Sequence, residues 1–117
     1  MFIIIHSMLF KIVWSMYANK KMDCYKNFSQ MTPEDDKNDA GKYINIVGRW
    51  HSVGGGSGVC ICSTENMEAL TSWMVNWSDM CDIHVEPVVD DETLRPILKE
   101  KLNRSLFGNM VKIDCCC

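Results

Sequence analysis

The sequence has no excess of basic residues that would favour a nucleic-acid partner. Its 117 residues include 12 lysines and arginines against 15 aspartates and glutamates, which gives a net charge of -3 at pH 7. Proteins that bind DNA or RNA neutralise several phosphates with clustered basic side chains, so this balance argues against such a partner. The hydrophobic content of 47% and the charged content of 23% are typical of a soluble globular protein.

A recognisable signal peptide and a membrane-spanning segment are also missing. The apolar residues 1–5 follow no positively charged residue, and His6, Ser7 and Lys11 interrupt the apolar run. A signal peptide needs a charged start and a longer run, and a spanning helix needs about 20 apolar residues. We therefore expect residues 2–6 to form a buried first strand in a protein of the cytoplasm or an organelle.

The cysteines follow neither the spacing of a zinc ribbon nor that of a disulfide framework. There are seven of them, an odd number, and we interpret them as reduced thiols of a reducing compartment. Three close the chain as Cys115, Cys116 and Cys117, where they cannot all be buried together. Three interpretations of this end stay open: a loose tail, a lipidated tail and a handle for a soft metal.

Sequence signatures of common catalytic and cofactor sites are absent as well. The glycine run after residue 53 is followed by no helix and no Lys-Ser or Lys-Thr pair, so it predicts a hairpin loop rather than a phosphate-binding loop. The acidic residues near Glu34 lack the ligand spacing of a calcium loop. No Ser-His-Asp order, reactive-cysteine signature or nucleotide fingerprint stands out.

What is present is a pattern of strands and amphipathic helices. Apolar spacing favours a helix from about residue 14 to residue 30, while residues 8–14 are compatible with strand or helix. Thr32 and Pro33 begin a short helix that Gly41 ends. Further along, the periodicity predicts strands over residues 43–52, 59–63 and 81–88, and helices over residues 67–79 and 90–102.

This order of elements predicts an α+β ferredoxin-like sandwich with the order βαββαβ. In such a fold, helices cover one face of a four-stranded antiparallel sheet. We expect one domain over residues 1–103, with an added C-terminal helix, and an extension with a cysteine-rich end over residues 104–117. The other face of so small a sheet needs a cover, and we predict that a second copy supplies it in a homodimer, as an α+β barrel.

Three short motifs with charged residues follow in order, and the first two each contain a tryptophan: Gly48-Arg49-Trp50-His51, then Asn76-Trp77-Ser78-Asp79, then Pro87-Val88-Val89-Asp90-Asp91-Glu92. In these motifs the chain resembles a family of small, functionally uncharacterised domains found in bacteria and algae. Members of that family look like dimeric α+β-barrel proteins. The resemblance implies a fold and an assembly but no reaction, because proteins of that architecture include monooxygenases, isomerases, haem-degrading enzymes and pure ligand binders.

The candidate site is centred on the strand over residues 43–52. Strict alternation sends Arg49 and His51 to the face opposite that of the strand's apolar side chains, where the polar face of the strand over residues 81–88 can join them. Histidine titrates near neutral pH and suits a general base, and arginine offers a planar anchor for a carboxylate or enolate. The candidate catalytic residues are His51, Arg49 and Glu86. The candidate ligand-binding residues are Arg49, His51, His84, Glu86 and Trp50.

A structural interpretation of the same residues stays open beside the functional one. Arg49 would then pair with Glu86 or Asp79, and His51 would cap the hairpin, since ion pairs across strands are ordinary. The indole N–H of Trp77 would likewise find a fixed partner in Asp79 or in backbone near the last helix.

Three functional hypotheses follow. The first is a small-molecule-binding dimer of barrel type, catalytic or not, that uses the histidine and arginine pocket. The second is a non-enzymatic interaction module or accessory subunit of a larger assembly. The third is a metal site, because His6, His51 and His84 all lie on predicted strands and imidazole is a ligand for zinc, copper and iron. The pattern indicates no particular cofactor.

Overall fold

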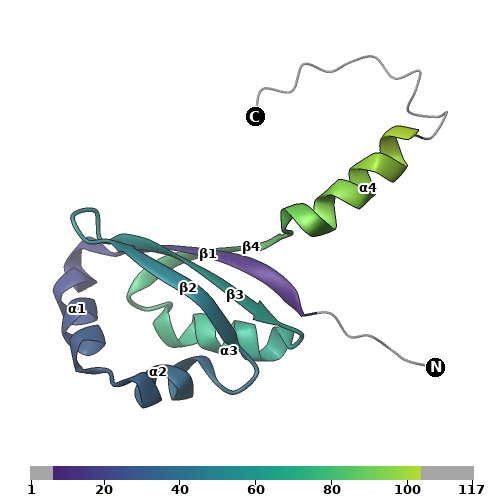
Figure 1. Cartoon of the computed structure of the whole chain (residues 1–117). Helices are drawn as coiled ribbons and strands as arrows, with labels where there is room; N and C mark the ends of the chain where they lie inside the picture. The colour runs from purple at the N-terminus through teal and green to yellow at the C-terminus, as the bar shows by residue number, and fades with distance from the viewer. Residues whose placement is uncertain (1–6, 104–117) are drawn as a thin grey trace.

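The computed structural model describes residues 7–103 (Figure 1). The expected strand over residues 2–6 and the extension over residues 104–117 lie outside these described residues. The elements follow in this order: β1 (Met8–Met16), the short 3-10 helix η1 (Ala18–Lys20), α1 (Lys21–Gln30), α2 (Pro33–Ala40), β2 (Asn45–Ser52), β3 (Ser57–Thr64), α3 (Met67–Trp77), β4 (Cys81–Val88) and α4 (Asp91–Asn103).

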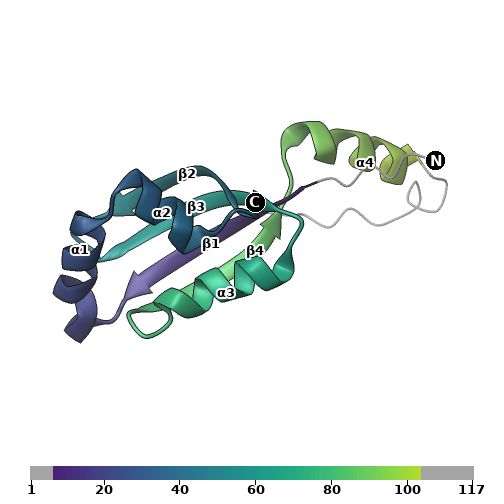
Figure 2. The same cartoon turned by 90° about the horizontal axis from the view of Figure 1, so that it is seen from below.

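The four strands form one antiparallel sheet in the order β2-β3-β1-β4. Helices α1 and α2 lie in the connection from β1 to β2, and α3 lies in the connection from β3 to β4. Figures 1 and 2 show these three helices on the same side of the sheet, which we call the covered face. The predicted ferredoxin-like α+β fold with a C-terminal helix is thus confirmed, and its first crossover is divided into two helices.

The predicted helix from about residue 14 is wrong at its start, because residues 14–16 belong to β1. β1 is a central strand, and Trp14 lies opposite Gly58 of β3 and Ile83 of β4. Hydrogen bonds to strands on both sides and the aromatic and β-branched residues of this stretch favour extended backbone. The predicted end of the helix near residue 30 agrees with α1.

The short helix α2 begins and ends where the sequence predicts. The Thr32 hydroxyl accepts a hydrogen bond from the backbone N–H of Asp35 at 3.1 Å, and the Asp35 carboxylate accepts one from the backbone N–H of Thr32 at 3.0 Å. This capping box satisfies two N–H groups at the helix start. Gly41 follows the last turn with a φ of 88°, a conformation that glycine adopts most easily.

β2 contains a β-bulge at Val47. Ile46 lies opposite Cys62 and Gly48 lies opposite Ile61, so two steps along β2 correspond to one step along β3. One extra residue in a strand reverses the face that every later side chain meets. The bulge therefore divides β2 into two halves with opposite alternation.

This reversal corrects the predicted faces of the GRWH motif. Ile46 before the bulge and Arg49 after it both belong to the covered face, as does His51. Gly48 and Trp50, which strict alternation would place with the apolar interior, lie on the opposite face, and the Trp50 side chain is 59% exposed there. Strict alternation failed because it assumes an unbroken strand.

The hydrophobic core lies between the covered face and the helices. Its buried residues are Phe10, Ile12, Ala40, Cys60, Cys62, Leu70 and Trp73. At the edge of this core, the ring of Trp14 lies directly against Gly58. A Cβ at Gly58 would overlap that ring and would also come within 2.6 Å of the Trp50 carbonyl oxygen, so only glycine fits there.

The opposite face of the sheet, which we call the open face, is covered by no helix among residues 7–103 (Figure 1). The C-terminal helix α4 extends away from the sheet beyond the end of β4 (Figures 1 and 2). Its predicted apolar stripe is exposed and consists of Leu94, Ile97, Leu98 and Leu102. Within residues 7–103, no helix is both long enough and apolar enough to cross a membrane.

Candidate functional site

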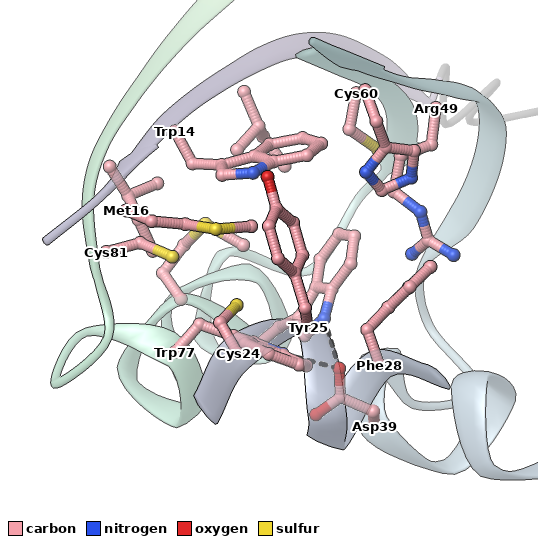
Figure 3. A pocket seen from close by; sticks show the side chains of 15 residues that line it. Trp14, Met16, Cys24, Tyr25, Phe28, Asp39, Arg49, Cys60, Trp77 and Cys81 are labelled. Carbon is pink, nitrogen blue, oxygen red and sulfur yellow. Dashed lines mark hydrogen bonds between the residues drawn. The ribbon is translucent and has the colours of Figure 1, made fainter. Parts of the chain in front are cut away.

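A cavity lies between the covered face of the sheet and the helices (Figure 3). The volume open to the centres of water molecules is about 90 Å³, enough for a compact ligand or several waters. Its lining side chains come from β1, α1, α2, β2, β3, α3 and β4. They are Ile12, Trp14, Met16, Cys24, Tyr25, Phe28, Asp39, Arg49, His51, Cys60, Trp73, Met74, Trp77, Cys81 and Ile83.

Arg49 points into this cavity region but is already paired. Its guanidinium donates two hydrogen bonds to the Asp36 carboxylate of α2, at 3.1 and 2.9 Å, and its Cζ atom lies 5.0 Å from the Phe28 ring centroid. The two side chains are only 20% and 28% exposed. A paired and half-buried arginine fixes α2 against β2, so the structural interpretation of Arg49 is supported, with Asp36 as partner in place of Glu86 or Asp79.

His51 lies at the mouth of the cavity between two aromatic rings. Its ring centroid is 5.5 Å from that of Trp14, in an edge-on arrangement, and 5.0 Å from that of Phe28. Burial against these rings lowers the pKa of His51 below its ordinary value, and the positive charge of Arg49 lowers it further. At neutral pH the imidazole is therefore neutral, with one nitrogen able to accept a hydrogen bond or a proton.

Asp39 anchors the floor of the cavity, and the sequence analysis missed it. Its Oδ2 atom accepts hydrogen bonds from the indole N–H of Trp73 at 3.0 Å and from that of Trp77 at 2.7 Å. Its Oδ1 atom accepts another from Asn76 at 3.3 Å. The expected partner of Trp77, Asp79, is thus replaced by a residue 38 positions earlier. A carboxylate in the last turn of a helix opposes the helix dipole, and this signal could have marked Asp39 as partnered elsewhere.

The glycine loop between β2 and β3 is tied to α1 beside the cavity mouth. The Tyr25 hydroxyl donates to the Val53 carbonyl oxygen at 2.8 Å, and the Lys21 ammonium donates to the Gly54 carbonyl oxygen at 3.3 Å. The predicted hairpin turn is confirmed, and Gly56 adopts a φ of 65°. These two contacts fix the position of the loop relative to the mouth.

Cys24 and Cys81 form a buried thiol pair at the end of the cavity away from Arg49. Burial raises the pKa of Cys24, and a hydrogen bond from the Cys81 thiol partly offsets that increase. Burial together with Cys24 raises the pKa of Cys81 to about 12. Nearer to Arg49, burial and the neighbouring Cys62 raise the pKa of Cys60 to about 11. These buried thiols are protonated at neutral pH.

The other predicted site residues lie on the open face and do not join Arg49 and His51. Glu86 forms an ion pair with Lys11 at 2.6 Å, and His84 lies 3.4 Å from the Asp82 carboxylate, all four side chains being well exposed. Trp50 also lies on that face. The predicted alternation in β4 is correct. Glu86 and His84 are separated from Arg49 because the bulge in β2 places Arg49 on the covered face.

A histidine metal site is not assembled by the described residues. His51 and His84 lie on opposite faces of the sheet, and His6 lies outside the described residues. Within residues 7–103, no group of three or more His, Cys, Asp and Glu side chains is placed to hold a metal ion. The convergence of imidazoles that the metal-site hypothesis requires is therefore not found for His51 and His84.

A second hollow lies at the other end of β2. It is more open than the first cavity, and its lining includes Lys42, Asn45 and Glu68 but no histidine, arginine or cysteine. The arrangement of aromatic rings, imidazole and thiols that distinguishes the first cavity is therefore not repeated there.

Comparisons with known proteins place the chain in a family without assigning a reaction. No curated protein and no solved structure matches it. One family model does match, over residues 8–102, which covers every described strand and nearly all of α4. The chain therefore belongs to the family described as a domain of unknown function, DUF3303.

Proposed function

We propose that the protein is a small-molecule-binding protein whose ligand site is the cavity between the covered face and the helices. The observation that carries the proposal is the cavity itself, which combines a mostly aromatic and sulfur-containing lining with one neutral imidazole at its mouth. Ligand sites are commonly concave and apolar, with a few placed polar groups that set orientation. His51 supplies such a group.

The size and lining of the cavity define the class of ligand. A volume of about 90 Å³ is smaller than the roughly 300–1,000 Å³ of sites for drug-sized ligands, so the ligand is compact. The rings of Trp14, Trp73 and Trp77 favour a flat aromatic molecule. A neutral His51 favours a ligand that donates one hydrogen bond, such as a phenol or an indole.

In this proposal, His51 is also the group for any proton transfer in the cavity. A neutral imidazole accepts a proton from a bound hydroxyl or N–H group at neutral pH. Arg49 does not serve as a free anchor for an anion in this proposal, because the Asp36 carboxylate already neutralises its charge and accepts two of its N–H groups. Glu86 and His84 take no part from within the same protomer, since they lie on the open face.

The test is a nuclear magnetic resonance titration of the labelled chain with p-cresol, using toluene as the matched ligand without a hydroxyl. Three of the four tryptophans line the cavity, and the fourth, Trp50, lies on the open face. We expect the indole N–H signals of Trp14, Trp73 and Trp77 to shift while that of Trp50 stays still. Toluene and the His51→Gln variant should bind with about 3- to 10-fold weaker affinity, the effect of one neutral hydrogen bond.

The control is His84→Gln, which changes an exposed strand histidine on the open face. This variant should bind p-cresol as the unchanged chain does. Equal affinities for p-cresol and toluene would remove His51 from the proposal. A titration that moves no cavity tryptophan, or that moves Trp50 equally, would remove the cavity as the site.

We also propose that two copies associate through their open faces, as in the dimeric α+β barrels that the sequence motifs resemble. The support is an uncovered sheet face that carries Trp50 and Val13 exposed to 59% and 38%, together with the exposed stripe of α4. Apolar surface of this extent on a small sheet is commonly buried by association. The α4 stripe, which extends beyond the sheet, is suited to reach across a second copy.

Analytical ultracentrifugation tests this assembly. The chain should sediment as a dimer, and the double variant Trp50→Asp with Leu98→Asp should sediment as a folded monomer. Asn38→Asp on α2 is the control, because that exposed residue lies on the helix side of the sheet. A monomeric unchanged chain would contradict the homodimer and would favour the alternative of an interaction module for a different protein.

A further inference from the structure

Sulfur-containing side chains from four elements line the cavity. Met16 ends β1, Cys24 lies in α1, Met74 lies in α3 and Cys81 begins β4. All four line the cavity. Figure 3 shows Met16, Cys24 and Cys81 with their sulfur atoms on one side of the cavity, opposite Arg49 and Cys60. Two thiols and two thioethers therefore border a single space.

Backbone pairing and a thiol hydrogen bond link three of these groups, Met16, Cys81 and Cys24. Met16 and Cys81 are direct partners in the antiparallel pairing of β1 and β4, so their side chains stand next to each other on the covered face. Cys81 donates a thiol hydrogen bond to Cys24. The two cysteines are 3% and 5% exposed, which places the group beyond bulk water but within reach of the cavity.

We propose that these four sulfur groups form a site for a soft monovalent metal ion, Cu(I). Thiolate and thioether ligands together favour Cu(I), whereas calcium and magnesium prefer oxygen ligands. Zinc sites are usually built from four thiolate, imidazole or carboxylate groups, and a pair of thioethers is a poor substitute for two of them.

The charge of the site also favours a monovalent ion. The cavity lining is mostly apolar and includes Ile83 and Trp77, and burying a net charge there is costly. Binding follows a balanced exchange in which Cu(I) replaces one thiol proton, so that Cys–SH and Cu(I) give Cys–S–Cu and one released proton. The product is neutral, and the second thiol remains protonated and continues to donate its hydrogen bond. No oxidant or reductant is consumed.

Cys24 is the better thiolate of the pair because it accepts the hydrogen bond from Cys81. The thioethers of Met16 and Met74 then complete a three-sulfur ligand set. This assignment uses the far end of the cavity and requires no organic ligand. Copper binding and the p-cresol titration can therefore succeed or fail separately.

The test is a competition for Cu(I) between the reduced chain and the chromogenic chelator bicinchoninate, without oxygen. The background is the full chain with C115S, C116S and C117S, which removes the three terminal thiols as competing ligands. We expect this background to withdraw one equivalent of Cu(I). Cys24→Ser and Met16→Leu each remove a direct ligand. Loss of a group that only supports a ligand weakens metal binding roughly 10- to 100-fold, so each of these variants should weaken Cu(I) binding by more than that.

Two controls keep the result interpretable. Cys60→Ala removes a buried thiol of the same cavity that lies on the Arg49 side, and it should leave the affinity unchanged. Met16→Leu conserves side-chain volume, so it remains informative if Cys24→Ser unfolds. X-ray absorption at the copper edge should show sulfur ligands alone.

Three outcomes would overturn the proposal. The first is a background variant that withdraws no stoichiometric Cu(I). The second is an affinity that Cys24→Ser and Met16→Leu leave unchanged. The third is an absorption spectrum with nitrogen ligands that disappear in His51→Gln, since the metal would then lie at the cavity mouth.

Discussion

Arg49 and Asp36 join β2 to α2 through two parallel hydrogen bonds of 3.1 and 2.9 Å. This contact fixes the helix that carries Asp39, and Asp39 in turn holds the indoles of Trp73 and Trp77. The cavity wall thus depends on two carboxylates of the eight-residue helix α2. Asp36 binds Arg49, and Asp39 binds the two indoles.

Asp36→Asn should destabilise the fold, because it leaves the Arg49 charge half-buried without its counterion. We expect a loss of about 1–2 kcal/mol, between the roughly 0.2–1 kcal/mol of an exposed pair and the roughly 3–5 kcal/mol of breaking a buried one. Urea unfolding measures it. The control Glu86→Gln breaks the exposed pair with Lys11 and should cost less. A cost for Asp36→Asn no greater than for Glu86→Gln would contradict this account.

Asp39→Ala should cost more than Asp39→Asn, because alanine removes the acceptor that both indole N–H groups share. Each polar group left without a partner in a buried position costs about 1–3 kcal/mol. Trp73 is buried and Trp77 is half-buried, so the two contributions need not be equal. Asn38→Ala, one position earlier on the same helix and exposed, is the matched control and should change the unfolding free energy little. Tryptophan fluorescence during unfolding should shift only in the Asp39 variants.

Gly58→Ala should be more damaging than Gly48→Ala. A Cβ at Gly58 would meet both the Trp14 ring and the backbone oxygen of Trp50, and the backbone cannot move without disturbing the β2–β3 pairing. A Cβ at Gly48 would meet only the end of the exposed Trp50 ring, which can turn away into solvent. We expect Gly58→Ala to cost about 1–3 kcal/mol, the range for overpacking. Thermal unfolding of the two variants checks the order.

The lowered pKa of His51 predicts a loss of stability on mild acidification. Since the folded-state pKa lies below the unfolded value of 6.5, the unfolded chain binds the proton first as the pH falls. The contribution of His51 is constant above pH 6.5 and becomes unfavourable below it. A titration of the imidazole signal should show a midpoint below 6.5, raised by Arg49→Gln because a positive neighbour is removed.

The stability of the unchanged chain and of His51→Gln, compared between pH 7.5 and pH 5, gives the thermodynamic check. The glutamine variant should lose less stability over that interval. His84→Gln is the control, because its side chain lies on the open face and should leave the His51 midpoint where it was. An imidazole midpoint above 6.5 would show that burial against Trp14 and Phe28 does not decide its charge.

The local features could be predicted from the sequence because they depend on neighbouring residues. The start of α2 at Thr32 and Pro33, its end at Gly41 and the strand over residues 81–88 all rest on contacts within a few positions or on simple periodicity. The element order then led to the ferredoxin-like topology, since few arrangements accommodate two βαβ crossovers of this length.

The site was predicted less well because its contacts join distant positions. Neither the use of Asp36 and Asp39 nor the meeting of Cys24 with Cys81 follows from spacing, since each contact requires elements to be packed. The first helix was extended too far because Trp14 fits a helical spacing by coincidence, while its pairing with β3 and β4 decides its conformation.

The bulge at Val47 means that the number of residues in β2, as well as their identity, decides which face of the sheet Arg49 and His51 occupy. Deleting this one residue would restore regular alternation and turn Arg49 and His51 toward the open face, with no other change in composition. Gly48 and Trp50 would turn the other way, toward the interior. One residue more or less in β2 therefore exchanges which pair of the GRWH motif lines the cavity and which pair lies on the open face.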